Sequence, residues 1–266
     1  MEKKGRSKVK VVILAGGFGT RISEESAFRP KPMLEIGGMP ILWHIMKNYS
    51  HYGFNEFVIC AGYKQHVIKE WFADYFLHTS DITFDFTNGN EMIVHNKHVE
   101  AWKVTVVDTG LNTQTGGRVK RIREYIGDEA FMLTYGDAVG DVNIADLLAF
   151  HHAHGKTGTL SMYNFGQNKG VVEVSAGNMI TAFREKSDLD GDLINIGYMV
   201  FQPELFDLIE GDDTVFEKGP LVKLVQQHQL AGYIHKGYWQ CMDTLREKQQ
   251  LEKLWDAGKA AWKVWD

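Results

Sequence analysis

The feature that most constrains this chain is an apolar run that ends abruptly in a glycine-rich turn. Val11–Leu14 are four consecutive apolar residues, the pattern of a strand that is buried on both faces of a parallel sheet. Residues 15–20, AGGFGT, follow at once, and their glycines permit a sharp turn that exposes backbone N–H groups. The sequence therefore predicts an α/β fold with a ligand-binding turn at the carboxyl end of its first strand.

Two basic side chains follow this turn. Arg21 and Lys31 are ten positions apart, and Pro30 and Pro32 restrict the backbone on either side of the lysine. Arginine can grip phosphate oxygens with two parallel N–H donors, whereas a lysine ammonium acts as a point charge. We therefore expect several phosphate groups to bind here. A structural turn with two solvated cations is the plainer alternative.

The turn differs from two well-known phosphate-binding loops. No Gly-Lys-Ser/Thr sequence closes it, as a P-loop requires. Gly17 and Gly19 are followed by Arg21 and Ile22 without a third glycine, so the dinucleotide-binding fingerprint is incomplete. Glu35 lies near the position of a ribose-binding carboxylate, but the glycine pattern makes a dehydrogenase the weaker interpretation.

The bulk composition limits the class of protein further. The 266 residues are 44% hydrophobic, which suffices for a large core, and the formal net charge of −5 argues against nucleic acid as a partner. Cys60 and Cys241 form no disulfide framework, so we expect two buried free thiols and a reducing cytoplasm. No apolar run approaches the length of a membrane span, and no signal peptide is recognisable, so we expect no membrane partner. Residues 1–8 are polar and basic, and a disordered tail is expected.

The rest of the sequence alternates between apolar strands and amphipathic helices, as in a mostly parallel sheet flanked by helices. We predict further strands over residues 57–61, 104–107, 131–135, 159–163, 178–184, 195–201 and 232–235, and a β-hairpin over residues 81–99 around Asn88–Asn90. We predict helices over residues 40–53, 63–75, 144–154, 203–209, 220–230 and 244–258. Such a sheet binds its ligand at the carboxyl ends of the strands.

One carboxylate stands where such a ligand would bind. The strand at 131–135 ends in Gly136-Asp137, and a carboxylate at the end of a central parallel strand faces the ligand crevice. A hard oxygen ligand there suits Mg²⁺, which binds through one or two carboxylates and substrate phosphates. An Asp that caps the next helix is the alternative. His151, His152 and His154 lack the companions of a zinc site, and we expect a solvated or partly buried helix end.

The C-terminal part carries two further predictions. Thr244 and Glu247 have the spacing of a capping box for the last helix, and Gly258 lies near its end. Trp262 and Trp265 make the final segment too aromatic for a free tail, so we expect it to pack on the body or on a neighbouring subunit.

Residues 16–21, GGFGTR, together with residues 30–33, PKPM, resemble the signature of the sugar-phosphate nucleotidyltransferases. The resemblance extends through residues 30–38, 41–47, 107–110, 115–118 and 240–246, and it is greatest to the members that transfer a cytidylyl group from CTP to glucose 1-phosphate. It implies a Rossmann-like α/β fold in which residues 9–266 form a single nucleotidyltransferase domain with an interwoven sugar-binding lobe. It also implies a homo-oligomer and a role early in deoxysugar supply for bacterial surface polysaccharides.

The resemblance assigns roles to individual residues. Nucleotide binding falls to Leu14, Ala15, Gly16, Gly17, Gly19, Thr20, Arg21, Thr113 and Arg118. Sugar-phosphate binding falls to Gly170, Glu185, Lys186 and Asn195, and the catalytic pair would be Arg21 and Lys31. Asp137 and Asp243 would hold Mg²⁺. Ser187 replaces the proline that the family usually carries after Glu-Lys, which loosens this loop.

Several alternatives stay open at this stage. The same chemistry with UTP, dTTP, GTP or another sugar 1-phosphate is one, and a non-catalytic sugar-nucleotide-binding subunit is another. A relative of the second kind would be expected to lose the metal carboxylates or the basic pair. The chain keeps Arg21, Lys31, Asp137, Lys186 and Asp243, which favours an enzyme. Residues 108–118 could also be an ordinary polar loop, Glu185-Lys186 a surface ion pair, and Asp243 part of a helix cap.

Overall fold

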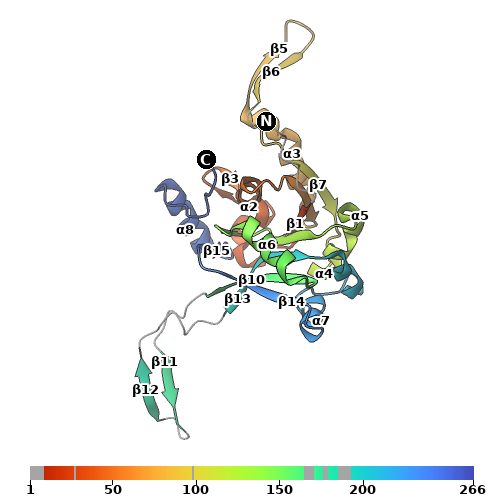
Figure 1. Cartoon of the computed structure of the whole chain (residues 1–266). Coiled ribbons are helices and arrows are strands. Elements are labelled where there is room, and N and C mark those ends of the chain that lie inside the picture. Colours follow the sequence, from red (N-terminus) through yellow and green to blue (C-terminus); the bar gives the residue numbers. More distant parts are fainter. Residues whose placement is uncertain (1–8, 27, 98, 165–170, 176–178, 185–192) are drawn as a thin grey trace.

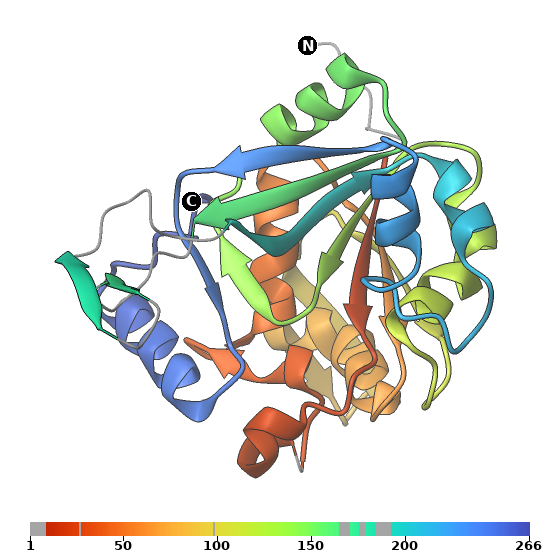
Figure 2. The same cartoon turned by 90° about the horizontal axis from the view of Figure 1, so that it is seen from below.

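The computed structural model describes residues 9–26, 28–97, 99–164, 171–175, 179–184 and 193–266, and its centre is a seven-stranded sheet (Figure 2). The strand order is β14-β10-β13-β8-β1-β4-β7. The strands are β1 (Lys10–Ala15), β4 (Glu56–Ala61), β7 (Lys103–Asp108), β8 (Phe131–Tyr135), β10 (Gly158–Asn164), β13 (Leu193–Phe201) and β14 (Leu230–His235). The strands predicted from the apolar runs are therefore present.

The sheet is mixed but mostly parallel. β8, β1, β4 and β7 run parallel to one another, and β10 runs parallel to β14. Only β13 is inverted, because it pairs antiparallel with both β8 and β10. The chain moves outward from β1 through β4 to β7 and then returns to place β8 on the other side of β1. The carboxyl ends of β1 and β8 therefore form the switch point at which sheets of this kind bind ligands.

The continuous apolar run of β1 supplies two cores at once. Val11 and Ile13 point into the first core, and Val12 and Leu14 into the second. The first core contains residues from α2 (Ile41–His51), α3 (Gln65–Thr79) and α6 (Ile144–His154). The second contains residues from α4 (Thr115–Arg121), α5 (Arg123–Ile126), the 3₁₀ helix η3 (Pro203–Leu208) and α7 (Pro220–Gln226). Helices thus cover both faces of the sheet, as the α/β prediction requires.

Two hairpins project from the body (Figure 1). The first consists of β5 (Ser80–Asp85) and β6 (Glu91–Lys97), and its turn contains the predicted Asn88–Asn90. The second consists of β11 (Val171–Val174) and β12 (Ile180–Arg184). The remaining short elements are η1 (Thr20–Ile22), α1 (Ser23–Ser26), η2 (Lys31–Met33), β2 (Glu35–Ile36), β3 (Met39–Pro40), β9 (Ala138–Gly140) and β15 (Trp239–Cys241).

The C-terminal segment packs on the body, as predicted. α8 (Leu245–Asp256) begins with a complete capping box, in which Thr244 and Glu247 each satisfy a backbone N–H of the other. The Trp262 and Trp265 side chains are buried, and both pack around His44 of α2. The last residues of the chain therefore belong to the first core.

Two expectations were wrong in detail. Residues 203–208 form a 3₁₀ helix, because Leu205 and Ile209 donate to carbonyls three residues earlier. α7 ends at Gln226 and does not reach Leu230, since His228 adopts a left-handed conformation (φ 55°) that ends the helix.

Within the described part of the chain, no helix has the length and apolar character to cross a membrane.

Of the three histidines of α6, His152 is exposed and His154 is partly buried, as expected for a solvated or partly buried helix end, but His151 differs. His151 is fully buried, and its Nδ1 lies 2.8 Å from Thr159 Oγ1. His154 Nε2 lies 2.7 Å from the same oxygen, and Gln202 Nε2 lies 2.9 Å from His151 Nε2. No group of three His, Cys, Asp or Glu residues capable of holding a metal occurs among the residues that the structure describes. The cluster is a buried polar network between helix and sheet.

Candidate active site

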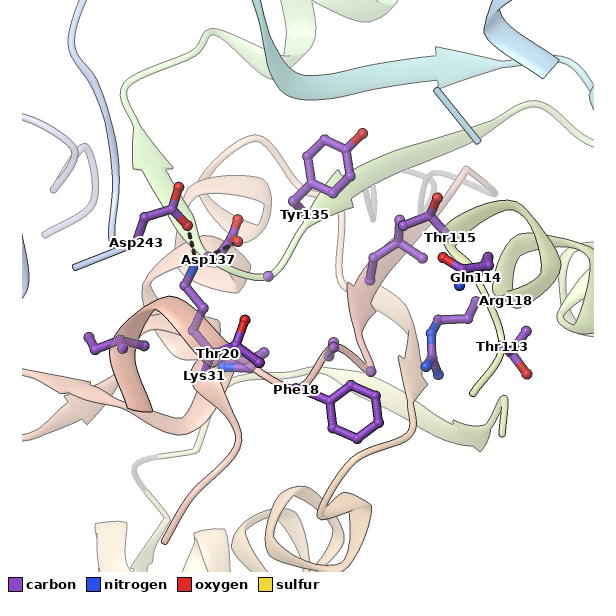
Figure 3. Close-up of a pocket in the computed structure, with 18 of the residues that line it drawn as sticks. Phe18, Thr20, Lys31, Thr113, Gln114, Thr115, Arg118, Tyr135, Asp137 and Asp243 are labelled. Atoms are coloured by element: carbon purple, nitrogen blue, oxygen red, sulfur yellow. Dashed lines mark hydrogen bonds and ion pairs between the residues drawn. The ribbon is translucent and has the colours of Figure 1, made fainter. Parts of the chain in front are cut away.

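A cavity of about 690 Å³ opens at the carboxyl ends of β1 and β8 (Figure 3). The predicted residues that line it are Leu14, Ala15, Gly16, Gly17, Gly19, Thr20, Lys31, Thr113, Arg118, Asp137 and Asp243. They come from the end of β1 and the glycine-rich turn, from η2, from α4 and the loop before it, and from the segments after β8 and β15. The fold thus brings most of the predicted site into one cavity at the switch point.

The glycine-rich turn is fastened at its far end. Gly19 adopts a left-handed conformation (φ 66°), and its carbonyl accepts hydrogen bonds from Ile22 N at 3.1 Å and Ser26 Oγ at 2.9 Å. Ile22 is fully buried and anchors η1 in the first core. A Cβ added at Gly17 would meet no protein atom within 4 Å, so this position faces open space on the ligand side.

Arg118 is the best-buried basic side chain of the cavity wall. Its Nη1 donates to Thr109 Oγ1 at 2.8 Å and to the Gly110 carbonyl at 2.7 Å, and its Nη2 donates to the Leu111 carbonyl at 3.1 Å. Burial lowers the pKa of this guanidinium, which nevertheless remains charged in proteins. Arg118 belongs to α4, so the alternative of an ordinary polar loop over residues 108–118 is wrong for its second half.

The position of the Arg118 guanidinium explains why residues 16 and 62 are glycines. A Cβ at Gly16 would lie 2.2 Å from Arg118 Nη1, and one at Gly62 would lie 2.4 Å from it. Nη1 also lies 3.3 Å from the Ala61 carbonyl at the end of β4. Arg118 therefore joins the connections that follow β1, β4 and β7, and it needs bare backbone at Gly16 and Gly62 to do so.

Lys31 stands between the two predicted metal carboxylates. Its Nζ donates to Asp137 Oδ2 at 2.8 Å and also forms an ion pair with Asp243 Oδ1 (Figure 3). The lysine side chain is only 11% exposed. Burial alone would lower its pKa, but the charges and hydrogen bonds of the two aspartates outweigh burial and raise the pKa above its usual value. Lys31 is therefore a fixed positive charge at neutral pH.

Backbone pairing brings Asp243 to Asp137. β15 pairs antiparallel with β9, and Met242 N donates to the Asp137 carbonyl at 2.9 Å. The backbone N–H of Asp243 donates to Glu247 Oε2 at 2.7 Å, and Thr244 supplies the side chain that caps α8. The Asp243 carboxylate is thus not the helix cap and points to Lys31.

The donor set fits a magnesium ion. Two carboxylates that share one ammonium group lie close enough to bind one cation, and carboxylate oxygens are the ligands that Mg²⁺ prefers. In the described ranges no third His, Cys, Asp or Glu completes a protein cage around them. This composition suits an ion that takes its remaining ligands from substrate phosphates and water.

The other predicted residues are less defined. The backbone of Arg21 forms part of η1, and its side chain lies outside the description. Asn195 is exposed on β13 and does not line the cavity, although it forms a hydrogen bond with Tyr135, which does. Gly170, Glu185 and Lys186 lie outside the described residues.

Sequence reasoning missed several lining residues. They are Phe18, Ile22, Pro32, Leu111, Asn112, Gln114, Thr115, Tyr135, Gly136, Trp239 and Cys241. Tyr135 could have been found, since it ends the strand that precedes Asp137. Cys241 was expected to be buried, but it is half-buried at the cavity wall, where burial and then Glu247 and Asp243 raise its pKa to about 11. The thiol therefore stays protonated.

Fold and cavity together define a class: an α/β protein whose cavity lies at a switch point and is lined by a glycine-rich turn, basic side chains and a pair of carboxylates. The profile of the Nucleotidyl transferase family matches residues 10–246, and the chain belongs to this family. The chain is therefore a nucleotidyltransferase.

Relatives and solved structures agree with this assignment. The chain is 53% identical over 259 residues to a glucose-1-phosphate cytidylyltransferase of Salmonella typhi, covering 97% of this chain and 100% of the relative. It is 42% identical to a probable glucose-1-phosphate cytidylyltransferase of Bacillus subtilis, with the same coverage. A UDP-glucose pyrophosphorylase structure in complex with UDP-glucose superposes with a TM-score of 0.67 at 15% identity, covering 94% of this chain and 99% of that one. The last comparison bears on the fold alone.

Proposed function

We propose that this chain transfers a cytidylyl group from CTP to glucose 1-phosphate, which gives CDP-glucose and pyrophosphate. The observation that carries the reaction type is the Lys31 ammonium paired with Asp137 and Asp243 in a cavity at the switch point. The choice of CTP and glucose 1-phosphate is supported by the full-length identity to the Salmonella and Bacillus proteins of that name.

The chemistry needs no strong base. A phosphate monoester has a second pKa near about 6, so the attacking oxygen is mostly ionised at neutral pH. This oxygen attacks the α-phosphorus of CTP, a new P–O bond forms, and the bond to the β-phosphate breaks in line to release pyrophosphate. The protein's task is to hold two mutually repelling anions in this geometry and to offset their charge.

Positive charge in the cavity fits that task. Lys31 would bridge the reacting phosphates, and Arg21 would stabilise the departing pyrophosphate. The Arg118 guanidinium donates its hydrogen bonds to carbonyl and hydroxyl oxygens, which are uncharged. They do not neutralise its positive charge, which therefore attracts the triphosphate. Thr113, buried beside Gly110, would lie near the base.

Mg²⁺ would be held by Asp137 and Asp243. When bound, it offsets phosphate charge and helps to align the two substrates. Lys31 would then exchange its carboxylate partners in part for phosphate oxygens, which bind an ammonium group equally well.

The sugar phosphate would bind next to this centre. We assign Lys186 to the attacking phosphate, and Glu185, Gly170 and Asn195 to the sugar. These residues would belong to a lobe interwoven with a single nucleotidyltransferase domain over residues 9–266. The assignment of Asn195 is supported by its hydrogen bond with Tyr135, a residue of the cavity wall.

We also propose that the protein is a homo-oligomer of the bacterial cytoplasm that supplies deoxysugars for surface polysaccharides. Its two cysteines are free thiols, which fits a reducing compartment. The β5–β6 hairpin carries Phe84 and Phe86, whose rings stack and are 54% and 78% exposed, and a second copy would cover them. Light scattering on a Phe84→Ser/Phe86→Ser variant, which would become smaller, tests this.

The test of the activity is pyrophosphate release with Mg²⁺ and glucose 1-phosphate, run in parallel with CTP, UTP, dTTP, ATP and GTP. Release with CTP alone is the expected outcome. Release with another nucleotide would keep the mechanism and refute the base assignment of Thr113 and Arg118. If the folded protein releases none but binds a sugar nucleotide, it is a binding subunit.

A further inference from the structure

One carboxylate outside the cavity lining is bonded to two side chains inside it. Glu217 lies in the turn before α7, and its Oε2 accepts a hydrogen bond from Thr115 Oγ1 at 2.9 Å. Its Oε1 accepts the hydroxyl hydrogen of Tyr135. Thr115 and Tyr135 line the cavity, whereas Glu217 does not. The carboxylate therefore stands behind the wall and holds two of its side chains.

The two side chains belong to different sides of the cavity. Thr115 begins α4, the helix that carries Arg118. Tyr135 ends β8, two residues before Asp137. In Figure 3 the Tyr135 ring lies between the pair of aspartates and the labelled side chains of α4. Glu217 thus links the nucleotide side of the cavity to the side with the carboxylate pair.

The turn that carries Glu217 is itself fixed on α4. Phe216 is fully buried in the second core, and its backbone N–H donates to Thr115 Oγ1 at 2.9 Å. The Thr214 carbonyl accepts a hydrogen bond from Gly116 N at 2.9 Å. Because the backbone that leads into Glu217 is held in this way, its carboxylate has a defined position relative to α4.

Tyr135 is held from its other side by β13. A Cβ added at Gly197 would lie 2.4 Å from Tyr135 Cδ2, so the ring fills the space that a side chain would occupy. The hydroxyl group of Tyr135 donates to Glu217 Oε1, so the side chain is fixed both at its ring and at its oxygen.

We propose that Glu217 is a positioning residue for nucleotidyl transfer and acts through Tyr135 and Thr115. The inference rests on the proposed function. By holding both hydroxyl groups, Glu217 fixes the separation between the wall that binds the nucleotide and the aspartates that face the reacting phosphates. Small displacements of reacting groups lower the rate strongly, because catalysis here depends on alignment.

The experiment is a double-mutant cycle on the full-length protein with Glu217→Ala, Tyr135→Phe and the combination. We expect Glu217→Ala to lower kcat about 10- to 100-fold. The double variant should be no slower than the slower single variant, because both changes remove the same hydrogen bond between Tyr135 and Glu217. Glu217→Gln keeps an acceptor oxygen and should restore part of the activity. Glu210→Ala, an exposed carboxylate paired with Lys223, is the matched control and should leave kcat unchanged.

Thermal unfolding separates positioning from general instability. The loss of two hydrogen bonds should lower the unfolding midpoint by only about 2–8 °C, so the protein remains folded in the assay. Normal kcat in Glu217→Ala, or multiplicative effects in the double variant, would overturn this inference and leave the proposed function standing. Absence of turnover by the unmodified protein would overturn the proposed function, and this role with it.

Discussion

At the scale of single residues, the Arg118 side chain requires a glycine at position 16 of the glycine-rich turn. We expect Gly16→Ala to be destabilised by about 1–3 kcal/mol, the usual cost of overpacking, because the new Cβ would lie 2.2 Å from Arg118 Nη1. The guanidinium cannot retreat without giving up carbonyl partners from two connections. Gly17→Ala is the control for stability, since its Cβ would meet nothing within 4 Å. Urea unfolding of both variants checks this, and equal losses would contradict the packing argument.

Lys31 is the second prediction at this scale. Lys31→Ala should lower kcat at saturating substrates by about 100-fold, the effect of removing one charge-stabilising donor, while the fold persists. The raised pKa of Lys31 means that it stays protonated from neutral pH to above its ordinary value of 10.5, so the rate should not fall through loss of this proton between pH 7 and pH 9. Steady-state kinetics over that range, with circular dichroism for the fold, measure both effects. A variant with unchanged kcat would remove Lys31 from the mechanism.

At the scale of the element, the start of α8 links helix stability to the site. Glu247 Oε2 accepts the backbone N–H of Asp243 at 2.7 Å and that of Thr244 at 2.8 Å. We expect Glu247→Ala to cost about 1 kcal/mol of stability and also to lower activity, because the backbone of Asp243 loses its hydrogen-bond acceptor. Glu247→Gln should retain both, since glutamine also completes a capping box.

The control for this prediction is on the same helix. Glu252 has a partly exposed side chain that pairs with Lys248, and Glu252→Ala should change neither quantity beyond the small effect of a surface pair. Thermal unfolding and pyrophosphate release would be measured for all three variants. If Glu247→Ala loses stability but keeps full activity, the cap does not position Asp243.

The sequence predicted those elements whose signals are local. β1 and β4 are apolar on both faces and read directly as buried strands, and the capping box follows from the spacing of Thr244 and Glu247. The predicted end of α7 was wrong because it depends on a left-handed His228, which residue patterns do not reveal.

The parts of the site that the sequence did not reveal depend on contacts between distant segments. Arg118 itself was predicted on the family resemblance, but its bonding was not, because its guanidinium is bound mainly by backbone carbonyls, which leave no pattern of side chains. Glu217 is about a hundred positions from Thr115 and meets it only because η3 and α7 pack beside α4 on the second core. By contrast, Asp137 and Asp243 were predicted as a pair, on the family resemblance, and they do share Lys31.

On the scale of the whole molecule, the C-terminal segment is held by a histidine that must remain neutral. His44 Nε2 lies 2.8 Å from the Ile36 carbonyl and therefore carries the proton, which leaves Nδ1 to accept from Trp262 Nε1 at 3.4 Å. Trp255 and Trp265 pack edge-on or tilted against the same ring. Protonation of Nδ1 would remove the acceptor and bury a charge among four indoles, so it opposes the packing that closes the first core.

The pH dependence of stability follows from this arrangement. Burial lowers the pKa of His44 from 6.5 to about 4, and hydrogen bonds to Ile36 and Met39 offset this only partly. The unfolded chain therefore binds a proton below about pH 6.5 that the folded protein does not, and stability is lost as the pH falls from that value towards 4. A shift of this size corresponds to about 3 kcal/mol. Buried His151, with its pKa lowered to about 4, contributes in the same direction.

We therefore expect the free energy of unfolding to be constant near pH 7 to 8 and to fall steeply between about pH 6.5 and pH 4.5. A His44→Gln variant, which can keep both a donor and an acceptor at the site but does not titrate, should be less stable at pH 7 and should lose less on acidification. His66→Gln, a change at an exposed histidine, is the matched control and should keep the full slope. Urea unfolding can be followed by the fluorescence of the seven tryptophans, which include Trp262 and Trp265. An unchanged slope in His44→Gln would assign the acid sensitivity to His151 and the carboxylates and would remove His44 from this account.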